Sequence, residues 1–393
     1  LMKLAPGARY QLFAGENSSG QLCRQLARCG VRRVLLVTDK PLVEMGFADR
    51  LSQQLTRAGV ETALFDGVVP DPGFAVVDQG LNCYREAACD AVLALGGGSS
   101  IDAAKMIAMA ATNPGDPRRY VGFSKLKLAP APLYAIPTTS GTGSEATTGA
   151  IISDDSEDRK LIVADPALLP RAAALDPLLL TGLPRSITAA TGMDALTHAI
   201  EAYIGHWEAG DSKEKAATAV RLIIEHLPAA CADGENLGAR DGMAHAAYMA
   251  GQAINQVNVG NVHAIAHQLG AIYGIAHGLA NACVLPHVLD LSRPRADQRL
   301  AELASLIGRE GAQGLVDAVR ALNQEIGIPA HLSQLRVEDI ETIARRAVKE
   351  GAGYPVPHLM SMADCTGILH KLLPENAVSS GSVGVDALEA GAC

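Results

Sequence analysis

The chain has 393 residues, of which 48% are hydrophobic and 19% are charged, and its formal net charge at pH 7 is −9. This composition is typical of a compact folded protein and excludes a disordered or coiled-coil chain. The negative charge disfavours nucleic acid and anionic membranes as partners. The length exceeds that of one ordinary core, so we expect two domains.

The sequence contains no uninterrupted apolar run of about 18 residues, and its first residues do not form a secretory signal segment. We therefore expect a cytoplasmic protein. The eight cysteines are scattered and include no C-x-x-C pair. This distribution indicates neither a zinc knuckle nor a disulfide framework, and we expect reduced thiols.

Short apolar strands alternate with helical patterns in the first part of the chain. The strand ends recur about every 30 residues, which is the length of a βα unit. The pattern predicts an α/β N-terminal domain, residues 1–182, with a parallel sheet flanked by helices. Strands are predicted at 34–37, 62–65, 91–95 and 133–136, and helices at 42–55, 74–88 and 101–111.

A glycine-rich turn, GGGSS, joins the strand at 91–95 to the next helix. Gly96, Gly97 and Gly98 let the backbone approach a ligand, and Ser99 precedes a helix N-terminus that favours anions. An ordinary strand-to-helix turn is the alternative, but three consecutive glycines exceed what a turn requires. We interpret the segment as a binding site for the pyrophosphate of a dinucleotide.

Asp39 ends the first predicted parallel strand. An acid at such a position can accept hydrogen bonds from the adenosine ribose and repel the 2′-phosphate of NADP, so we expect a preference for NAD. The arrangement is not the G-x-G-x-x-G fingerprint, because here the acid precedes the glycines. The alternative role for Asp39 is to cap the helix that begins near Leu42.

A second polar segment, PTTSGTGSE, follows the strand at 133–136. Its five hydroxyl groups, among them those of Thr138, Thr139 and Thr142, and its two glycines could form another cradle for the coenzyme. Further on, Lys160 follows an acidic turn. By composition alone Lys160 would be a surface charge.

Strand signals stop after Leu183-Pro184, which places the domain boundary near 182 and predicts an all-α C-terminal domain, residues 183–393. Pro228, Pro286 and Pro329 are expected to end helices. Helices are predicted at 187–204, 212–231, 239–257, 261–272, 279–291, 297–308, 313–325 and 337–349.

Three histidines interrupt the apolar helical segment GNVHAIAHQLGAIYGIAHG. His263 and His267 are four residues apart and project from one helical face, and His277 follows in a turn bracketed by glycines. Upstream, Asp194 and His198 are also four apart on an apolar helix. These side chains could close around a divalent ion, although histidines on apolar helices are more often hydrogen-bonded core residues.

Four motifs in this order resemble those of the iron-containing (group III) alcohol dehydrogenases, and the resemblance covers nearly the whole chain. It implies a dehydroquinate synthase-like fold. The motifs are GGGSSIDAAK at 96–105, PTTSGTGSE at 137–145, GMDALTH at 192–198 and HAIAHQLG at 263–270.

The resemblance also implies roles for individual residues. Asp194, His198, His263 and His277 would bind the metal, and His267 would lie in the catalytic site without binding it. Lys160 matches the family lysine that reaches the ribose of the coenzyme. The full set of expected coenzyme contacts is Asp39, Gly96, Gly97, Gly98, Ser99, Asp102, Thr138, Thr139, Thr142 and Lys160.

The expected reaction is hydride transfer between NAD and a small alcohol or aldehyde whose oxygen is bound to a divalent metal. The family implies Fe²⁺, with Zn²⁺ as a possible substitute. A homo-oligomer, and specifically a dimer, is expected, with no nucleic-acid or membrane partner. His267 could pass the proton to solvent.

Three alternatives remain open at this stage. A metal-dependent cyclase or lyase resembling dehydroquinate synthase would need several Lys and Arg residues for an acidic substrate, whereas the helical motifs are mostly apolar. A metallopeptidase would need a glutamate where Ala264 stands in the H-x-x-x-H spacing. A non-catalytic scaffold would leave four metal-competent side chains without a purpose.

Overall fold

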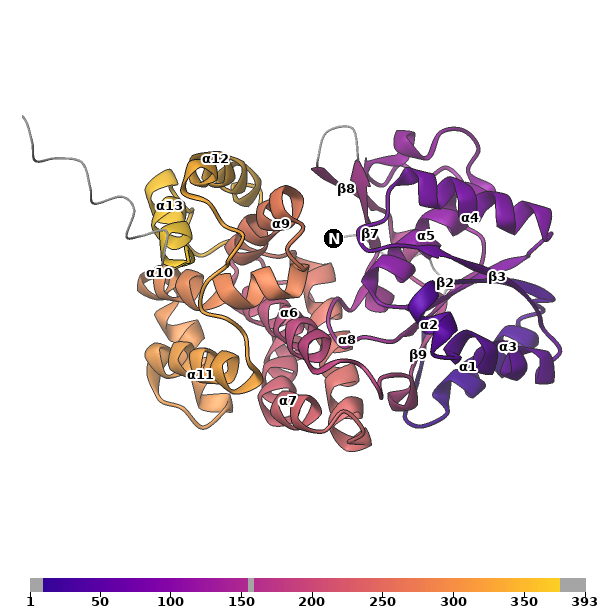
Figure 1. The fold of residues 1–393 in the computed structure, drawn as a ribbon, viewed down its shortest axis with the longest axis horizontal. Helices are drawn as coiled ribbons and strands as arrows, with labels where there is room; N and C mark the ends of the chain where they lie inside the picture. The colour runs from indigo at the N-terminus through magenta and orange to yellow at the C-terminus, as the bar shows by residue number, and fades with distance from the viewer. Residues whose placement is uncertain (1–9, 155–158, 375–393) are drawn as a thin grey trace, which may run out of the picture.

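The computed structural model describes residues 10–154 and 159–374. An α/β part and a helical part lie side by side in it (Figure 1). Within the described residues, no helix is long and apolar enough to cross a membrane. The seven cysteines in the described ranges are not joined by disulfides.

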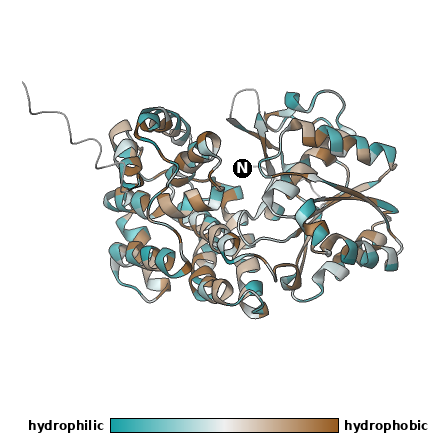
Figure 2. Cartoon of the chain, in the orientation of Figure 1, coloured by the Kyte–Doolittle hydropathy of each residue, from teal (hydrophilic) through white to brown (hydrophobic). Residues whose placement is uncertain are grey.

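Six parallel strands form the main sheet, in the order β1-β9-β6-β4-β2-β3. The parallel sheet predicted from the repeating strand and helix pattern is therefore confirmed. Figure 2 shows hydrophobic residues along these strands, as expected for a sheet buried on both faces. The strands are β1 (Gln11–Ala14), β2 (Arg33–Asp39), β3 (Glu61–Val68), β4 (Ala91–Gly96), β6 (Leu133–Pro137) and β9 (Ala172–Leu175).

Helices cover both faces of this sheet, because successive strand residues point to opposite sides. Val34 and Leu36 of β2 pack in the core under α1 and α3, whereas Leu35 and Val37 pack under α4 and α5. The helices are α1 (Ser18–Arg28), α2 (Lys40–Glu44), α3 (Phe47–Arg57), α4 (Phe74–Glu86) and α5 (Gly98–Thr112).

A smaller three-stranded sheet, in the order β5-β8-β7, lies beside the main one. Its strands, and β1 and β9 of the main sheet, were not predicted from the sequence. The strands are β5 (Gly122–Phe123), β7 (Gly149–Asp154) and β8 (Arg159–Ala164), and short 3₁₀ helices are η1 (Pro117–Tyr120), η2 (Ser144–Ala146), η3 (Pro166–Leu168), η4 (Pro177–Leu179) and η5 (Val337–Asp339).

The second part of the chain is helical in its described residues, as predicted, and one hydrophobic core joins its helices. The unpredicted α13 is the last of them. The helices are α6 (Arg185–Ile204), α7 (Ser212–Ala232), α8 (Leu237–Val257), α9 (Asn261–Tyr273), α10 (His277–Leu306), α11 (Gly311–Ile326), α12 (Ile340–Gly351) and α13 (Met362–Lys371).

Several predicted helix boundaries are wrong. The helix expected at 42–55 is divided into α2 and α3 by Gly46, whose φ of +74° is left-handed. The helices expected at 279–291 and 297–308 are both contained in α10, and the non-helical backbone of Ala296 separates them by a kink directly before the expected start at 297, which confirms the break. His277 is the first residue of α10 and does not lie in a turn.

Two of the three prolines expected to end helices do not end them. Pro228 lies inside α7 and Pro286 lies inside α10. An interior proline costs about 3 kcal/mol. Leu227 and Leu285, their neighbours, are fully buried, and the packing of such residues offsets this cost. Pro329 does follow the end of α11.

The two parts of the chain touch backbone to backbone at Gly143 and Gly251. Gly143 lies in the segment after β6 and has a φ of +60°, and Gly251 is in the middle of α8. A Cβ atom added to Gly251 would lie 2.5 Å from the carbonyl oxygen of Gly143. Neither position has room for a side chain, so glycine is required at this contact.

Candidate metal and coenzyme site

Three of the expected coenzyme segments meet at one edge of the main sheet. Asp39 ends β2, Gly96 ends β4 and Thr138 follows β6, and these parallel strands are adjacent. Gly96 is in register with Pro137, and the Thr138 N–H donates to the carbonyl oxygen of Gly96 at 3.0 Å. Ligands of open α/β sheets bind at this carboxyl edge.

The glycine-rich turn passes close to the threonine-rich segment. Gly96 has a φ of +152°, which favours glycine, and α5 begins at Gly98. A Cβ atom on Gly97 would lie 3.2 Å from Thr139 Oγ1, and one on Gly98 would lie 2.7 Å from Thr142 Cγ2. The structure therefore brings the two polar segments together at the N-terminus of a 15-residue helix.

Asp39 caps α2. Its Oδ1 accepts from the Leu42 N–H at 3.0 Å, which confirms the capping role that the sequence left as an alternative. Burial raises the pKa of Asp39 above its usual range. Its other carboxylate oxygen, Oδ2, accepts no hydrogen bond within the described residues and is available to a ribose. The contact with the ribose stays a prediction.

Asp102 forms part of a buried polar network. Its Oδ1 accepts from Ser144 Oγ at 2.5 Å, and its Oδ2 accepts from the Ile151 N–H at 3.0 Å. Lys105, fully buried one turn later on α5, donates to Ser144 Oγ at 2.9 Å and to Thr147 Oγ1 at 3.0 Å. The network ties α5 to the threonine-rich segment. Lys105 was not singled out from the sequence, because lysine in a motif normally indicates an exposed charge.

Lys160 lies between the glycine-rich turn and the histidines. Its Nζ donates to Asp71 Oδ1 at 2.7 Å, and the Asp71 N–H lies 3.4 Å from Ser99 Oγ. Its positive charge also contributes to lowering the pKa of His277. Lys160 is therefore not an isolated surface charge.

The four expected metal ligands converge. One ligand atom from each of Asp194, His198, His263 and His277 lies within 4.8 Å of the others. Two come from α6, one from α9 and one from the start of α10. The side chains of the first three are 2–6% exposed and that of His277 is 28% exposed, so small molecules would reach the cluster from the His277 side.

Close helix packing brings these ligands together. Spacing of four residues puts Asp194 and His198 on one face of α6. The start of α10 lies directly against that helix, because Gly278 has no side chain and approaches the carbonyl oxygen of Ala190 and the Cβ of Asp194. A larger residue at 278 would push His277 away from the cluster.

The charges of the cluster suit a cation. Burial lowers the pKa of His198 to about 4 and that of His277 well below its usual range, so both imidazoles are neutral donors at pH 7. Burial opposes ionisation of Asp194, but the neighbouring histidines hold its pKa below the usual range. One carboxylate and three imidazoles form a donor set that fits Fe²⁺ or Zn²⁺.

Glu201, one turn after His198, orients His263. Its Oε2 lies 2.6 Å from His263 Nδ1, and the carboxylate also accepts from the N–H groups of Gly260 and Val262. Burial would lower the pKa of His263, but Glu201 and Asp194 raise it to about 9. Nδ1–H is donated to Glu201, an arrangement common among metal-binding histidines, and Nε2 lies 3.7 Å from Asp194 Oδ1. With a pKa of about 9, the imidazole would release the Nε2 proton when a cation binds.

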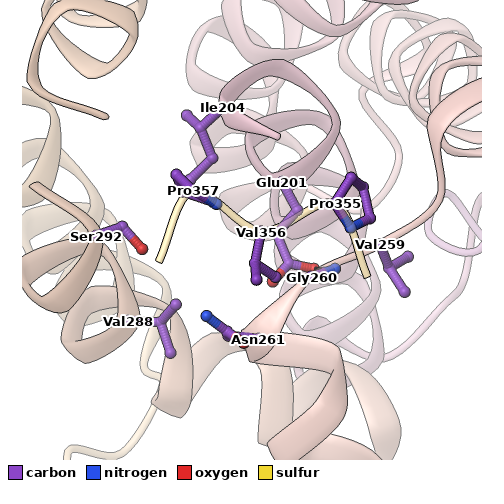
Figure 3. Close-up of a pocket in the computed structure, with 10 residues that line it drawn as sticks. All are labelled: Glu201, Ile204, Val259, Gly260, Asn261, Val288, Ser292, Pro355, Val356 and Pro357. Atoms are coloured by element: carbon purple, nitrogen blue, oxygen red, sulfur yellow. Dashed lines mark hydrogen bonds between the residues drawn. The ribbon is translucent and has the colours of Figure 1, made fainter. Parts of the chain in front are cut away.

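Glu201 also lines a small cavity (Figure 3). It offers about 10 Å³ to the centre of a water molecule, which is about one water. Glu201 lies beside Gly260 at its wall. Glu201 was not predicted as a site residue, although its spacing of seven residues from Asp194 places both on the same face of α6.

His267 lies next to the cluster, as expected. Its ring centroid is 5.3 Å from that of His277, and its Nδ1 lies 2.5 Å from Glu350 Oε1. Glu350 also accepts from the Tyr354 hydroxyl at 2.6 Å and from Gln268 Nε2 at 2.7 Å. His267 is not among the four converging ligands. Its partner Glu350 comes from α12, too far along the chain to be paired with it from the sequence.

Both parts of the chain match known families. Residues 10–177 match the family described as iron-containing alcohol dehydrogenase, and residues 188–373 match the C-terminal family of the Fe-containing alcohol dehydrogenases. The chain belongs to the iron-containing alcohol dehydrogenase family. It is therefore an oxidoreductase, and these matches support the dehydrogenase over the cyclase or lyase alternative.

Particular relatives cover almost the whole chain. A 1,3-propanediol dehydrogenase of Klebsiella pneumoniae is 39% identical over 357 residues, which is 88% of this chain and 92% of the relative. An NAD-dependent methanol dehydrogenase of Bacillus methanolicus is 35% identical over 369 residues, 91% of this chain and 97% of the relative. The crystal structure of a 1,3-propanediol oxidoreductase superposes with a TM-score of 0.90 at 37% identity, covering 92% of this chain and 98% of that one.

Proposed function

We propose that this alcohol dehydrogenase transfers a hydride between NAD and a small alcohol or aldehyde, and that Asp194, His198, His263 and His277 hold the divalent ion that the reaction requires. The convergence of these four ligand atoms within 4.8 Å carries the proposal. The ion supplies Lewis-acid chemistry and NAD supplies the hydride acceptor. A relative named as an NAD-dependent methanol dehydrogenase supports the choice of coenzyme.

The coenzyme and the metal are bound by two different sets of residues. The edge formed by Asp39, Gly96–Ser99 and Thr138–Thr142 binds the coenzyme, with its pyrophosphate at the N-terminus of α5. Lys160, held by Asp71, lies on the side of this edge that faces His277. The nicotinamide end of the coenzyme would therefore extend towards the metal ligands. The half-buried Asp102 acts by holding the threonine-rich segment in place.

His267 is the proposed proton carrier. Its Nδ1–H is directed to Glu350, which leaves Nε2 available to exchange a proton with the substrate hydroxyl. The side chains of His267 and Glu350 are 15% and 28% exposed, so a proton can continue to solvent. Tyr354 fixes the Glu350 carboxylate from the other side.

The metal is proposed to be Fe²⁺, which the family description names. The same donors accept Zn²⁺, which binds nitrogen and oxygen ligands more tightly than Fe²⁺ does. Elemental analysis of protein made in iron-rich medium should show one divalent ion per chain. The absence of any stoichiometric divalent ion would contradict the site.

A direct spectrophotometric assay tests the reaction itself. The protein reconstituted with Fe²⁺ or Zn²⁺ should oxidise NADH with short aldehydes, followed at the absorbance band of NADH. The His263→Ala variant under the same conditions is the control. Activity that is equal in both proteins, or absent from the wild type across a panel of alcohols and aldehydes, would contradict the proposal.

Three further proposals follow from the family resemblance and the sequence. The protein is a homodimer, it is cytoplasmic, and its domains divide near residue 182. The position of α6, which begins at Arg185 after the last strand of the main sheet, supports the boundary. Light scattering coupled to size-exclusion chromatography would test the dimer.

A further inference from the structure

Asn255 of α8 joins the helical part of the chain to the α/β part by two hydrogen bonds. Its carboxamide oxygen, Oδ1, accepts from the Thr148 N–H at 2.9 Å and from Thr148 Oγ1 at 2.8 Å. The two residues are 107 apart in the sequence. Neither of them was predicted as a site residue.

Thr148 lies where the antiparallel strands β7 and β8 meet the rest of the chain. β7 begins at the next residue, Gly149, and the carbonyl oxygen of Thr148 accepts from the N–H of Asp165, directly after β8, at 3.0 Å. Both strands lie on the side of the α/β part that faces the helical part (Figure 1). One bonded residue therefore holds an end of each strand to α8.

These two strands connect Thr148 with the surroundings of the metal ligands. β8 lies next to α9, the helix that carries His263 and His267. It also carries Lys160, whose charge contributes to lowering the pKa of His277. In the proposed function, Lys160 binds the coenzyme and the nicotinamide end extends towards the metal ligands. The position of β7 and β8 therefore affects the distance between the nicotinamide and the metal.

The other contacts of this segment with the helical part are close contacts made by glycines. A Cβ atom on Gly141 would lie 2.7 Å from the Cβ of Thr191 in α6, and Gly143 touches Gly251. Such contacts limit how closely the segment approaches the helices, but they have no preferred direction. Hydrogen bonds are directional. The two that end on Asn255 can therefore set the direction in which β7 leaves the contact.

We propose that Asn255 is a positioning residue for hydride transfer. Its Oδ1 holds Thr148, and Thr148 holds β7 and β8 at the distance from the metal ligands that the reaction requires. The inference rests on the proposed function and adds to it a residue that acts through Thr148. A displacement of about 1 Å at a reacting centre can lower the rate about 10²-fold, so two ordinary hydrogen bonds can have a large effect on kcat.

Three variants and a control test this role. Asn255→Ala removes the acceptor, and Asn255→Asp keeps an oxygen that accepts from both groups of Thr148 but has no NH₂ group. Thr148→Val removes the hydroxyl donor and keeps the backbone N–H. The control is Gln256→Ala, because Gln256 is the next residue of α8 and its Nε2 donates to Asp211 within the helical part. Asn255 is exposed, so its replacement should leave the fold intact.

The metal-loaded proteins are assayed with NADH and the aldehyde that the wild type reduces fastest. Asn255→Ala should lower kcat about 10- to 100-fold. It should keep the KM for NADH and the metal content, because Asn255 is not among the proposed coenzyme contacts or the four metal ligands. With deuterated NADH, its isotope effect on kcat should be at least as large as that of the wild type, since hydride transfer is the step that is slowed. Asn255→Asp and Gln256→Ala should keep the wild-type kcat.

Thr148→Val shows whether the effect of Asn255 passes through Thr148. This variant should lose less kcat than Asn255→Ala, because the N–H of Thr148 still donates. The double variant should have the same kcat as Asn255→Ala alone, since the hydroxyl has no acceptor left to lose. Losses that multiply in the double variant would show two independent effects and would overturn the inference.

Two further results would also overturn it. If Asn255→Asp loses as much kcat as Asn255→Ala, the NH₂ group is the important part, and Asn255 contacts the coenzyme or the substrate itself. If Asn255→Ala keeps the wild-type kcat, or has a smaller isotope effect, its bonds to Thr148 do not position hydride transfer. A wild-type protein without NADH-linked activity would instead refute the proposed function, and this inference with it.

Discussion

Nδ1 of His263 lies 2.6 Å from Oε2 of Glu201, and both side chains are buried. The same carboxylate accepts the N–H groups of Gly260 and Val262 at the start of α9. One glutamate thus fixes both the beginning of the helix and the orientation of the imidazole. The position of His263 depends on a residue that is not itself a metal ligand.

We predict that Glu201→Gln weakens metal binding about 10- to 100-fold, the usual effect of losing a partner of a metal-binding histidine. A glutamine oxygen can replace only one of the two carboxylate oxygens, so one backbone N–H group at the start of α9 loses its acceptor, and a lower melting temperature is also expected. Chelator competition measures the affinity. Glu225→Gln, on the exposed surface of α7, is the control. Unchanged affinity in Glu201→Gln would show that His263 needs no such support.

We predict that His263→Ala and His267→Ala have different effects. His263→Ala should lose both the metal and the activity. His267→Ala should keep the metal and lose about 10²-fold or more in kcat, the usual scale of general acid–base catalysis. Metal content by elemental analysis, combined with kcat, distinguishes them. Equal loss of metal in both variants would contradict the separate role of His267.

We predict that the enzyme prefers NAD over NADP about 10- to 1000-fold, because Asp39 repels the 2′-phosphate. Asp39→Asn should reduce this preference. Asparagine is also a good N-cap, so the hydrogen bond to the Leu42 N–H can be kept. The measurement is kcat/KM for NADH and NADPH in both proteins. An unchanged ratio would leave Asp39 with the capping role alone.

We predict a pH-dependent contribution of Glu145 to stability. Burial raises its pKa from 4.5 to about 7. Between these values the folded chain holds a proton that the unfolded chain has released, so the free energy of unfolding falls as pH rises, by about 3 kcal/mol in total. The stabilisation is therefore complete below pH 4.5 and lost above pH 7.

Glu145→Gln removes this titration. The melting temperature of the variant minus that of the wild type should be greater at pH 8 than at pH 5. Differential scanning fluorimetry of both proteins at the two pH values measures the difference. A melting difference that is the same at pH 5 and pH 8 would show that Glu145 has an ordinary pKa.

We predict that Gly251→Ala disturbs the alignment of the two parts of the chain. The added Cβ lies 2.5 Å from the carbonyl oxygen of Gly143, and such overpacking costs about 1–3 kcal/mol. We expect a lower melting temperature and a lower kcat with full metal content. Gly238→Ala, in the first turn of α8 with space around it, is the control. A normal kcat in Gly251→Ala would contradict the prediction.

The sequence predicted those features that depend on local pattern. The βα repeat around β2, β3 and β4 indicated a parallel sheet, and i,i+4 spacing selected Asp194 with His198 and His263 with His267. Comparison with known proteins bears out the family and the fold. The roles of the individual site residues stay predictions.

The features that were missed depend on contacts between distant segments. Glu350 reaches His267 across 83 residues, and Asn281 reaches Asp194 across 87. No spacing rule connects such pairs, because their proximity is created by helix packing. The same reason explains Pro286, which the sequence marked as a helix end and which tertiary packing holds inside α10. At Pro286, tertiary packing outweighs the low helix propensity of proline.

The contact between Gly143 and Gly251 limits how the two parts of the chain can move relative to each other. Main-chain atoms of the two parts already touch at this point, with no side chain between them that could yield. The two parts therefore cannot approach each other more closely at this contact. Ser144, which follows Gly143, is bound to Lys105 of α5 by a hydrogen bond. We expect any movement that admits or releases the coenzyme to be a rotation about this point. The pair of glycines would then act as a fulcrum, so that the metal ligands and the coenzyme edge return to the same alignment after each turnover.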